Sequence, residues 1–151
     1  MARRRARECA LQVLYTQDQT GDDAGAALRA YWAQPVEGVE GADTRPIDSE
    51  EMSYCDKLVR GVESQRAALD ALIEGASQHW RLPRMPVVDR NILRLAAYEL
   101  VHCHDVPASA CIDEGVEIAK RYGDKDSRAF VNGILDRIAA EVGRGGRRTR
   151  P

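Results

Sequence analysis

Apolar residues recur every three or four positions through most of this 151-residue chain, and that spacing constrains the fold more than any other feature. Residues three and four apart lie on one face of an α-helix, so each such run predicts one amphipathic helix. No segment alternates apolar and polar residues over the roughly four to eight positions of a half-buried strand. The sequence therefore predicts an all-α fold of about seven helices, without a sheet or an internal repeat.

Residues that start or stop helices separate the periodic runs. Asp22 or Asp23 can cap the second helix, Pro35 ends it, and Gly21 and Gly123 each follow the end of a helix. The stretch 35–46 contains glycine, proline and charge without a period, which predicts a loop. The predicted helices begin near residues 4, 24, 48, 66, 87, 107 and 127.

Two apolar stripes predict particular buried faces. The stripe of the second helix comprises Ala26, Ala27, Ala30 and Tyr31. That of the third comprises Met52, Cys55, Val59 and Val62. The helix that follows Pro86, over about 87–102, is apolar around most of its circumference, as expected of a central buried helix.

The length suits one ordinary domain, which we place at residues 1–143. A chain of this size can bury roughly 70% of the surface that its unfolded form exposes, so it needs no disulfide or metal to build a core. No apolar run approaches the roughly 18–20 residues of a membrane span, and no secretion signal is recognisable, which predicts a soluble, cytoplasmic protein. Residues 144–151 have no apolar side chains and are predicted to form a disordered basic tail.

The distribution of charge argues for local rather than general contact with a polyanion. The chain has 22 Lys and Arg against 24 Asp and Glu, but eight arginines lie in the two end segments 1–7 and 144–151, which contain no acid. The 14 remaining basic residues face all 24 acidic ones across the body of the chain. An acidic body with arginine-rich ends can still place cations at chosen points against a nucleic acid.

No catalytic constellation or cofactor loop is present, which favours a protein that is not an enzyme and needs no cofactor. The sequence has no Walker loop, no GxGxxG after a strand and no GxSxG. A zinc site at His102, Cys103, His104 and Cys111 is disfavoured, because this spacing matches no structural zinc pattern. The cysteines are interpreted as small buried side chains.

The start of the first helix carries an arginine arm, defined as Arg3, Arg4, Arg5 and Arg7. The macrodipole disfavours positive charge at this end of a helix, so a helix optimised for its own stability would carry acids there. Guanidinium groups match phosphate geometry and stack on bases, which makes RNA or DNA the natural partner. The alternative is a solvated, fraying terminus. Replacing all four arginines with alanine is expected to weaken nucleic-acid binding and to change thermal unfolding little.

A single strand also needs planar groups for its unstacked bases. Tyr15 follows the arm on the first helix, and Tyr122 and Phe130 flank the segment 123–128. Backbone amides at the start of the last helix, with Lys125 and Arg128, can hold a phosphate. The alternative is that Phe130 belongs to the core and that Asp126 is only a helix cap.

Three stretches resemble the NusB family of bacterial transcription antitermination factors. They read RRRARECALQVLY at 3–15, VDRNILRLAAYEL at 88–100, and DVP at 105–107 followed by DEGVEIAKRYG at 113–123, which continues into SRAFVNGILD at 127–136. The resemblance covers most of the chain apart from residues 20–47 and the tail. One departure is Gly115, where family members commonly have alanine, at a cost of roughly 1 kcal/mol unless another helix packs closely there.

The resemblance implies two packed helical bundles, with a boundary near residues 80–86, and binding of the single-stranded boxA element of nascent ribosomal-RNA leaders. It implies a ribosomal-protein partner, NusE, and a larger complex with NusA, NusG and RNA polymerase that resists termination. The stretch 88–100 would supply part of the surface for NusE. The RNA contacts that it implies are Arg3, Arg4, Arg5, Arg7, Gln12, Tyr15, Lys120, Asp126, Ser127 and Phe130.

Two other functions remain open at this point. Some members of the family self-associate, so a homodimer with a structural or storage role is one alternative. Similar helical domains also precede ribosomal-RNA cytosine methyltransferases, which makes an accessory RNA-binding domain the other. The α/β cofactor domain of those enzymes has no counterpart in the sequence. We therefore expect a non-catalytic RNA-binding factor.

Overall fold

The computed structural model describes residues 3–34, 46–78 and 80–144. All regular elements in this part of the chain are helices, as the apolar spacing predicted. The predicted loop at 35–46 lies almost entirely outside the described residues, as does the tail beyond Arg144. The elements are α1 (Arg4–Thr20), α2 (Ala24–Ala33), α3 (Ser49–Ser64), α4 (Arg66–Ala76), the short 3₁₀ helix η1 (Leu82–Arg84), α5 (Val87–His102), α6 (Ala108–Tyr122) and α7 (Ser127–Glu141).

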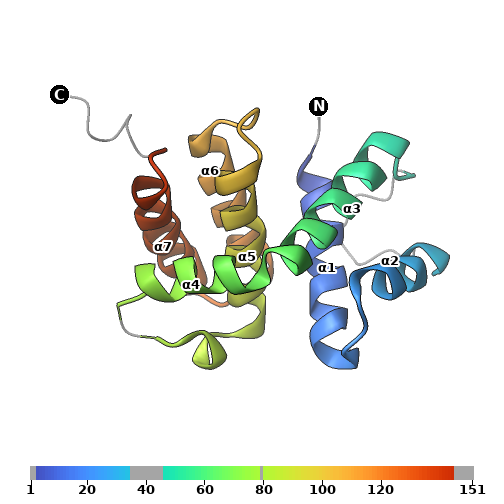
Figure 1. Cartoon of the computed structure of the whole chain (residues 1–151), viewed down its shortest axis with the longest axis horizontal. Helices are drawn as coiled ribbons and strands as arrows, with labels where there is room; N and C mark the ends of the chain where they lie inside the picture. Colours follow the sequence, from blue (N-terminus) through green and yellow to red (C-terminus); the bar gives the residue numbers. More distant parts are fainter. Residues whose placement is uncertain (1–2, 35–45, 79, 145–151) are drawn as a thin grey trace.

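The helices form two groups around α5 (Figure 1). Helices α1, α2 and α3 pack on one another on one side, and α4, α6 and α7 pack with α5 on the other. The two groups meet where α5 contacts α1 and α3. By these contacts the chain passes from the first group to the second at Gln65, between α3 and α4. The sub-bundle boundary near 80–86 stays a prediction.

Several helix ends follow directly from the sequence. Gly21 adopts a left-handed conformation (φ 75°) after α1, and its amide donates to Gln17, which ends the helix as a C-terminal glycine commonly does. Asp23 caps α2 by accepting from the Ala26 amide. Asp48 and Glu51 form a reciprocal capping box at the start of α3.

Two predicted faces are wrong in part, because a helical stripe was displaced by about one residue. In α2 the buried side chains are Ala24, Ala27 and Leu28, whereas Ala30 is exposed. The buried face of α3 includes Tyr54, Cys55 and Leu58, so Met52 lies outside it and is 37% exposed. Both corrections follow from the 3.6-residue turn, since either stripe fits the short apolar pattern.

Close helix contacts occur at two glycines. A Cβ atom on Gly61 of α3 would lie 2.2 Å from the Tyr98 ring of α5, so this crossing depends on the missing side chain. A Cβ atom on Gly115 of α6 would lie 2.9 Å from Leu135 of α7 and 3.5 Å from Ala96 of α5. Helices α5, α6 and α7 therefore approach closely at Gly115, which is the condition that offsets the cost of glycine inside a helix.

The end of the described chain is fastened to α5. The Arg144 guanidinium donates to the Leu100 carbonyl at 3.0 Å and to the Val106 carbonyl, and more weakly to Glu99. Leu100 and Val106 lie in the last turn of α5 and in the following turn, where carbonyl groups lack helical partners, whereas the Glu99 carbonyl also accepts from the Cys103 amide at 2.9 Å. Arg144, predicted as the first residue of the disordered tail, is thus ordered by these contacts.

Among the described residues, no helix is long and apolar enough to cross a membrane.

Candidate nucleic-acid interface

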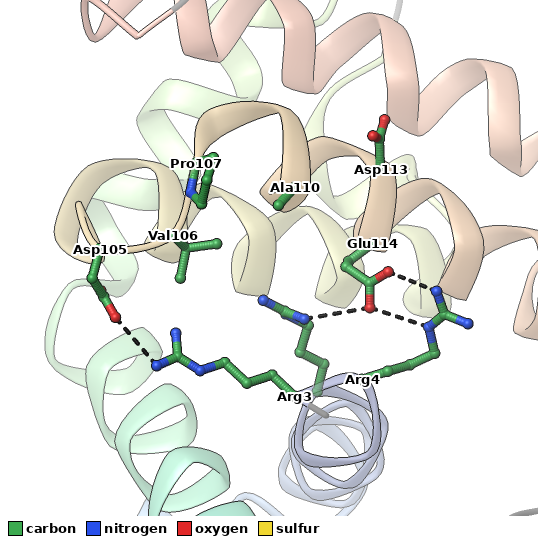
Figure 2. Close-up of a pocket in the computed structure, with 9 residues that line it drawn as sticks. Arg3, Arg4, Asp105, Val106, Pro107, Ala110, Asp113 and Glu114 are labelled. Carbon is green, nitrogen blue, oxygen red and sulfur yellow. Dashed lines mark hydrogen bonds and ion pairs between the residues drawn. The ribbon is translucent and has the colours of Figure 1, made fainter. Parts of the chain in front are cut away.

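Three members of the arginine arm, Arg3, Arg4 and Arg7, face the second group of helices (Figure 2). Arg3 occupies the N-cap position of α1 and forms an ion pair with Asp105 at 3.2 Å. Arg4 donates from Nε and Nη2 to the two carboxylate oxygens of Glu114 on α6, at 3.1 and 2.7 Å. The positive start of α1 is therefore compensated by acids of the same chain.

Of Arg3, Arg4 and Arg7, Arg7 has the most deeply buried side chain. Its Nε and Nη2 atoms donate to the carboxylate of Glu99 on α5, both at 2.8 Å, and the Tyr54 hydroxyl of α3 donates to the same carboxylate at 2.5 Å. The Arg7 side chain is 7% exposed and that of Glu99 is 1% exposed. One buried carboxylate thus joins three helices and both helix groups.

The electrostatics of this buried cluster follow its geometry. Burial by itself lowers the pKa of Arg7, but the hydrogen bonds and charge of Glu99 more than offset it, so the pKa is raised above its ordinary value. Burial, together with the adjacent Glu99 carboxylate, also raises the pKa of the Tyr54 phenol. Both groups are therefore held in their usual protonation states, with Arg7 charged and Tyr54 neutral.

An open groove of about 760 Å³ separates the arm from the start of α6. Arg3, Arg4 and Arg7 line one side, and Asp105, Val106, Pro107, Ala110, Asp113 and Glu114 line the other. Arg4 is 45% exposed and Glu114 is 20% exposed. The hydrogen bond from Arg4 lowers the pKa of Glu114, and that from Arg3 lowers the pKa of Asp105. The groove thus presents two arginines that remain open to solvent.

The arm does not act as one uniform surface, because its members differ in exposure. Arg3 and Arg4 reach solvent, whereas Arg5 and Arg7 are buried, at 8% and 6% exposure. The burial of Arg5 and Arg7 argues against the expectation that replacing all four with alanine changes thermal unfolding little. Removing Arg7 would leave the Glu99 carboxylate buried without its main partner.

Further along α1, two predicted contacts point outward. Tyr15 is 46% exposed, among the most exposed large apolar side chains in the described part of the molecule. Gln12 is exposed, and its Oε1 atom accepts a hydrogen bond from the Tyr31 hydroxyl of α2 at 2.9 Å. Both residues lie C-terminal to the arm on the same helix, as predicted.

The predicted contacts around the start of α7 divide between surface and core. Lys120 and Asp126 are exposed. Ser127 is 1% exposed, and Phe130 is half-buried against the core, so the alternative of a partly structural Phe130 agrees with its position. The Asp126 amide donates to the Asp124 carboxylate at 2.8 Å.

The turn before α7 is organised by side chains of the turn itself. Asp126 occupies the N-cap position, but its side chain makes no capping bond; Asp124 accepts from the Asp126 amide, and the Asp124 amide donates to Ser127 Oγ at 3.0 Å. The alternative that Asp126 is only a helix cap is corrected accordingly, because its side chain makes no capping bond. At least one amide that was expected to hold a phosphate is already satisfied by Asp124.

A second contact joins α1 to the end of α6. Glu8 accepts from Arg121 at 2.7 Å and from the Tyr122 hydroxyl at 3.0 Å. The Arg121 side chain is 52% exposed, and Tyr122 is 37% exposed. Tyr122 is therefore brought beside the arm helix, as a base-stacking role would require, while Glu8 and Arg121 were not predicted.

The acids that pair with the arm have no signal in the local sequence. Glu99 and Glu114 lie 92 and 107 residues from Arg7 in the chain, so no local spacing connects them.

Within the described residues, no group of three or more His, Cys, Asp and Glu could hold a metal ion. Cys103 and Cys111 are buried thiols, and burial raises the pKa of Cys111 to about 12.

Comparison with known proteins identifies the family. The model of the NusB family matches residues 4–140. A transcription antitermination protein NusB from Sorangium cellulosum is 45% identical over 143 residues, which cover 95% of each chain. The protein of that name from Trichlorobacter lovleyi is 48% identical over 139 residues, covering 91% of this chain and 90% of its own.

Solved structures agree in fold over nearly the full length. T. maritima NusB has a TM-score of 0.79 and 37% identity, covering 93% of this chain and 92% of its own. A structure of antitermination factors NusB and NusE in complex with dsRNA has a TM-score of 0.76 and 27% identity, covering 92% and 96%. The curated relatives are named for transcription antitermination, which is not a catalytic activity. Their similarity over more than nine-tenths of the sequence shows that this chain belongs to the NusB family of transcription antitermination proteins.

Proposed function

We propose that this protein binds single-stranded boxA-like RNA in nascent ribosomal-RNA leaders and thereby helps RNA polymerase to resist termination. The observation that carries the proposal is the open groove beside α1, in which Arg3 and Arg4 reach solvent next to an otherwise acidic body. Exposed guanidinium groups are suited to bidentate contact with phosphate.

The remaining RNA surface in this proposal extends from the arm along α1 and across to α6 and α7. Tyr15 and Tyr122 supply exposed rings for stacking, and Gln12, Lys120 and Asp126 supply polar contacts. Phe130 offers a half-buried ring edge. Arg5, Arg7 and Ser127 are buried, so they support this surface from beneath rather than forming its outer layer.

The proposed partners follow from the family. NusE is the ribosomal-protein partner, and NusA, NusG and RNA polymerase complete the antitermination complex. A structural relative has been solved with NusE and dsRNA together, which supports NusE and RNA as partners of the present chain. NusA, NusG and RNA polymerase are proposed from the family resemblance alone. Moderate RNA affinity is expected without NusE, because few exposed cations line the groove.

A gel-shift series tests the proposal. The protein, with and without NusE, is titrated against a boxA-like single strand, its shuffled sequence and a duplex of the same length, at two salt concentrations. Preference for the boxA-like strand in the presence of NusE is expected. Equal binding of the shuffled strand would overturn the proposal, and preference for the duplex would redirect it to double-stranded RNA.

Paired variants locate the interface. Arg3→Ala with Arg4→Ala should weaken binding and reduce the log–log salt slope by roughly 1.4, the value for two single-strand phosphates. Arg84→Ala is the matched control, since Arg84 is exposed on η1 and does not line the groove. If both proteins bind RNA as the wild type does, the arm is not the contact surface.

A further inference from the structure

Glu114 is bound as a phosphate would be bound. Its two carboxylate oxygens accept the Nε and Nη2 hydrogens of Arg4 in a fork at 3.1 and 2.7 Å, and Oε1 lies 3.4 Å from Nη1 of Arg7 (Figure 2). Carboxylates and phosphates use the same two-pronged geometry with arginine. The solvent-exposed arginine that the proposed function assigns to RNA is therefore already occupied by an anion of the protein.

We propose that Glu114 is an internal competitor of RNA: binding exchanges the Arg4–Glu114 pair for an Arg4–phosphate contact, so this carboxylate limits RNA affinity. The inference rests on the proposed function and adds a residue that sets the strength of binding at the same groove. It concerns Arg4, and it leaves the Arg7–Glu99 pair in place.

Differences in exposure explain why one pair exchanges and the other does not. Arg4 is 45% exposed and Glu114 is 20% exposed, so water and an incoming phosphate can reach this pair. Such a pair is screened and holds its partners weakly. Arg7 and Glu99 are 7% and 1% exposed, and Tyr54 also binds Glu99. The inner pair therefore keeps α1 in position while the outer pair opens.

The charge around Arg4 supports competition rather than assistance. Glu8 and Glu117 add to the negative potential that Glu114 creates at Arg4. When a phosphate takes Arg4, the released Glu114 carboxylate remains close to the incoming negative charge in the groove. The Glu114 carboxylate and the phosphate are both negative and repel each other, so removal of the Glu114 charge should favour the RNA-bound form.

Asp113 offers a matched control. It is adjacent to Glu114 on α6 and lines the same groove, but its side chain points away from the arm (Figure 2). It forms no ion pair within the described part of the chain. Glu114→Gln and Asp113→Asn each remove one negative charge from neighbouring positions, and only the first removes a partner of Arg4.

The test measures RNA affinity by fluorescence anisotropy with a boxA-like single strand, using wild type, Glu114→Gln and Asp113→Asn, each with NusE. Glu114→Gln should bind about fivefold more tightly than wild type, which corresponds to ~1 kcal/mol, the upper range for an exposed ion pair. Asp113→Asn removes the same charge from the groove without releasing Arg4, so it should tighten binding clearly less than Glu114→Gln does. Thermal unfolding confirms that each variant is folded.

A second background shows whether the effect passes through Arg4. In Arg4→Ala, the further change Glu114→Gln should tighten binding less than it does in the wild-type background, because no Arg4 remains for Glu114 to occupy and only the repulsion between the carboxylate and the phosphate is relieved. Unchanged or weaker binding by Glu114→Gln in the wild-type background, or equal tightening by both charge variants, would overturn the inference and leave the proposed function intact. If wild-type protein shows no preference for the boxA-like strand over its shuffled form, the proposed function fails, and this inference fails with it.

Discussion

At the scale of single residues, Arg4 and Arg7 perform different tasks although they lie one turn apart on α1. Arg4 pairs with a half-buried carboxylate at the surface, whereas Arg7 pairs with a carboxylate that is almost completely buried. Breaking a buried pair leaves an uncompensated charge in the interior, while an exposed pair is replaced by water. The two substitutions should therefore have different effects on stability.

We expect Arg7→Ala to lower the free energy of unfolding by about 3–5 kcal/mol, because Glu99 would remain buried without its cation. Arg4→Ala should lower it by less than about 1 kcal/mol. Urea unfolding followed by circular dichroism measures both. Similar losses in the two variants would show that the Arg7–Glu99 pair is not more important for stability than the surface pair.

Some residues of the candidate site can be predicted from the sequence and others cannot. The arm and Tyr15 are visible in the sequence, because arginines at a helix start and an aromatic off the buried stripe depart from local rules. Glu99 and Glu114 could not be found in this way, since they meet Arg7 only after helices distant in sequence have packed. The burial of Arg5 and Arg7 was missed for the same reason.

At the scale of elements, the crossing of α3 and α5 depends on Gly61. Gly61→Ala should destabilise the protein by about 1–3 kcal/mol, because the new methyl group would overlap the Tyr98 ring. The control is Gly75→Ala in α4, where the added Cβ would meet no heavy atom within 4 Å beyond its chain neighbours and the backbone of its own helix. That change should stabilise by up to about 1 kcal/mol through helix propensity. Thermal unfolding compares them, and a shift of the same sign in both would contradict the packing argument.

Two variants test which side chain stabilises the turn before α7. Asp124→Ala should cost about 1 kcal/mol, since it removes the acceptor of the Asp126 amide. Asp126→Ala should change stability by less than about 0.5 kcal/mol, because its side chain makes no capping bond. Chemical denaturation distinguishes the two. A larger loss from Asp126→Ala would mean that the N-cap residue, and not Asp124, holds the turn.

Helix existence and most helix ends could be predicted, and helix faces less so. Gly21, the acidic start at Asp48 and the proline at position 107 act within one turn of chain, so their effect is readable locally. The face of a short helix such as α2 depends on its neighbours, which explains the error at Ala30.

At the scale of the whole molecule, the arm couples stability to pH. Arg4 lowers the pKa of Glu114, so its ionised form stabilises the folded state. This contribution is complete above the unfolded pKa, near the ordinary value of 4.5, and is lost as pH falls through the lower folded value. Asp89 acts in the opposite direction, because burial raises its pKa.

We therefore expect Arg4→Ala to lose less stability than wild type as pH falls from about 6 to about 3. The contribution of Asp89 is common to both proteins and cancels in the comparison. Unfolding in urea at a series of pH values provides the measurement. Parallel curves for the two proteins would show that the Arg4–Glu114 pair is not linked to folding.

The attachment of Arg144 to the end of α5 bears on where this protein can be shortened. The last helix ends at Glu141, yet the Arg144 guanidinium serves carbonyl groups at positions 99, 100 and 106. A recombinant fragment cut after Gly143 would keep every helix and still deprive the Leu100 and Val106 carbonyls of their side-chain donor. The practical limit for trimming, or for a cleavable purification tag, therefore lies after residue 144 rather than at the last helical turn.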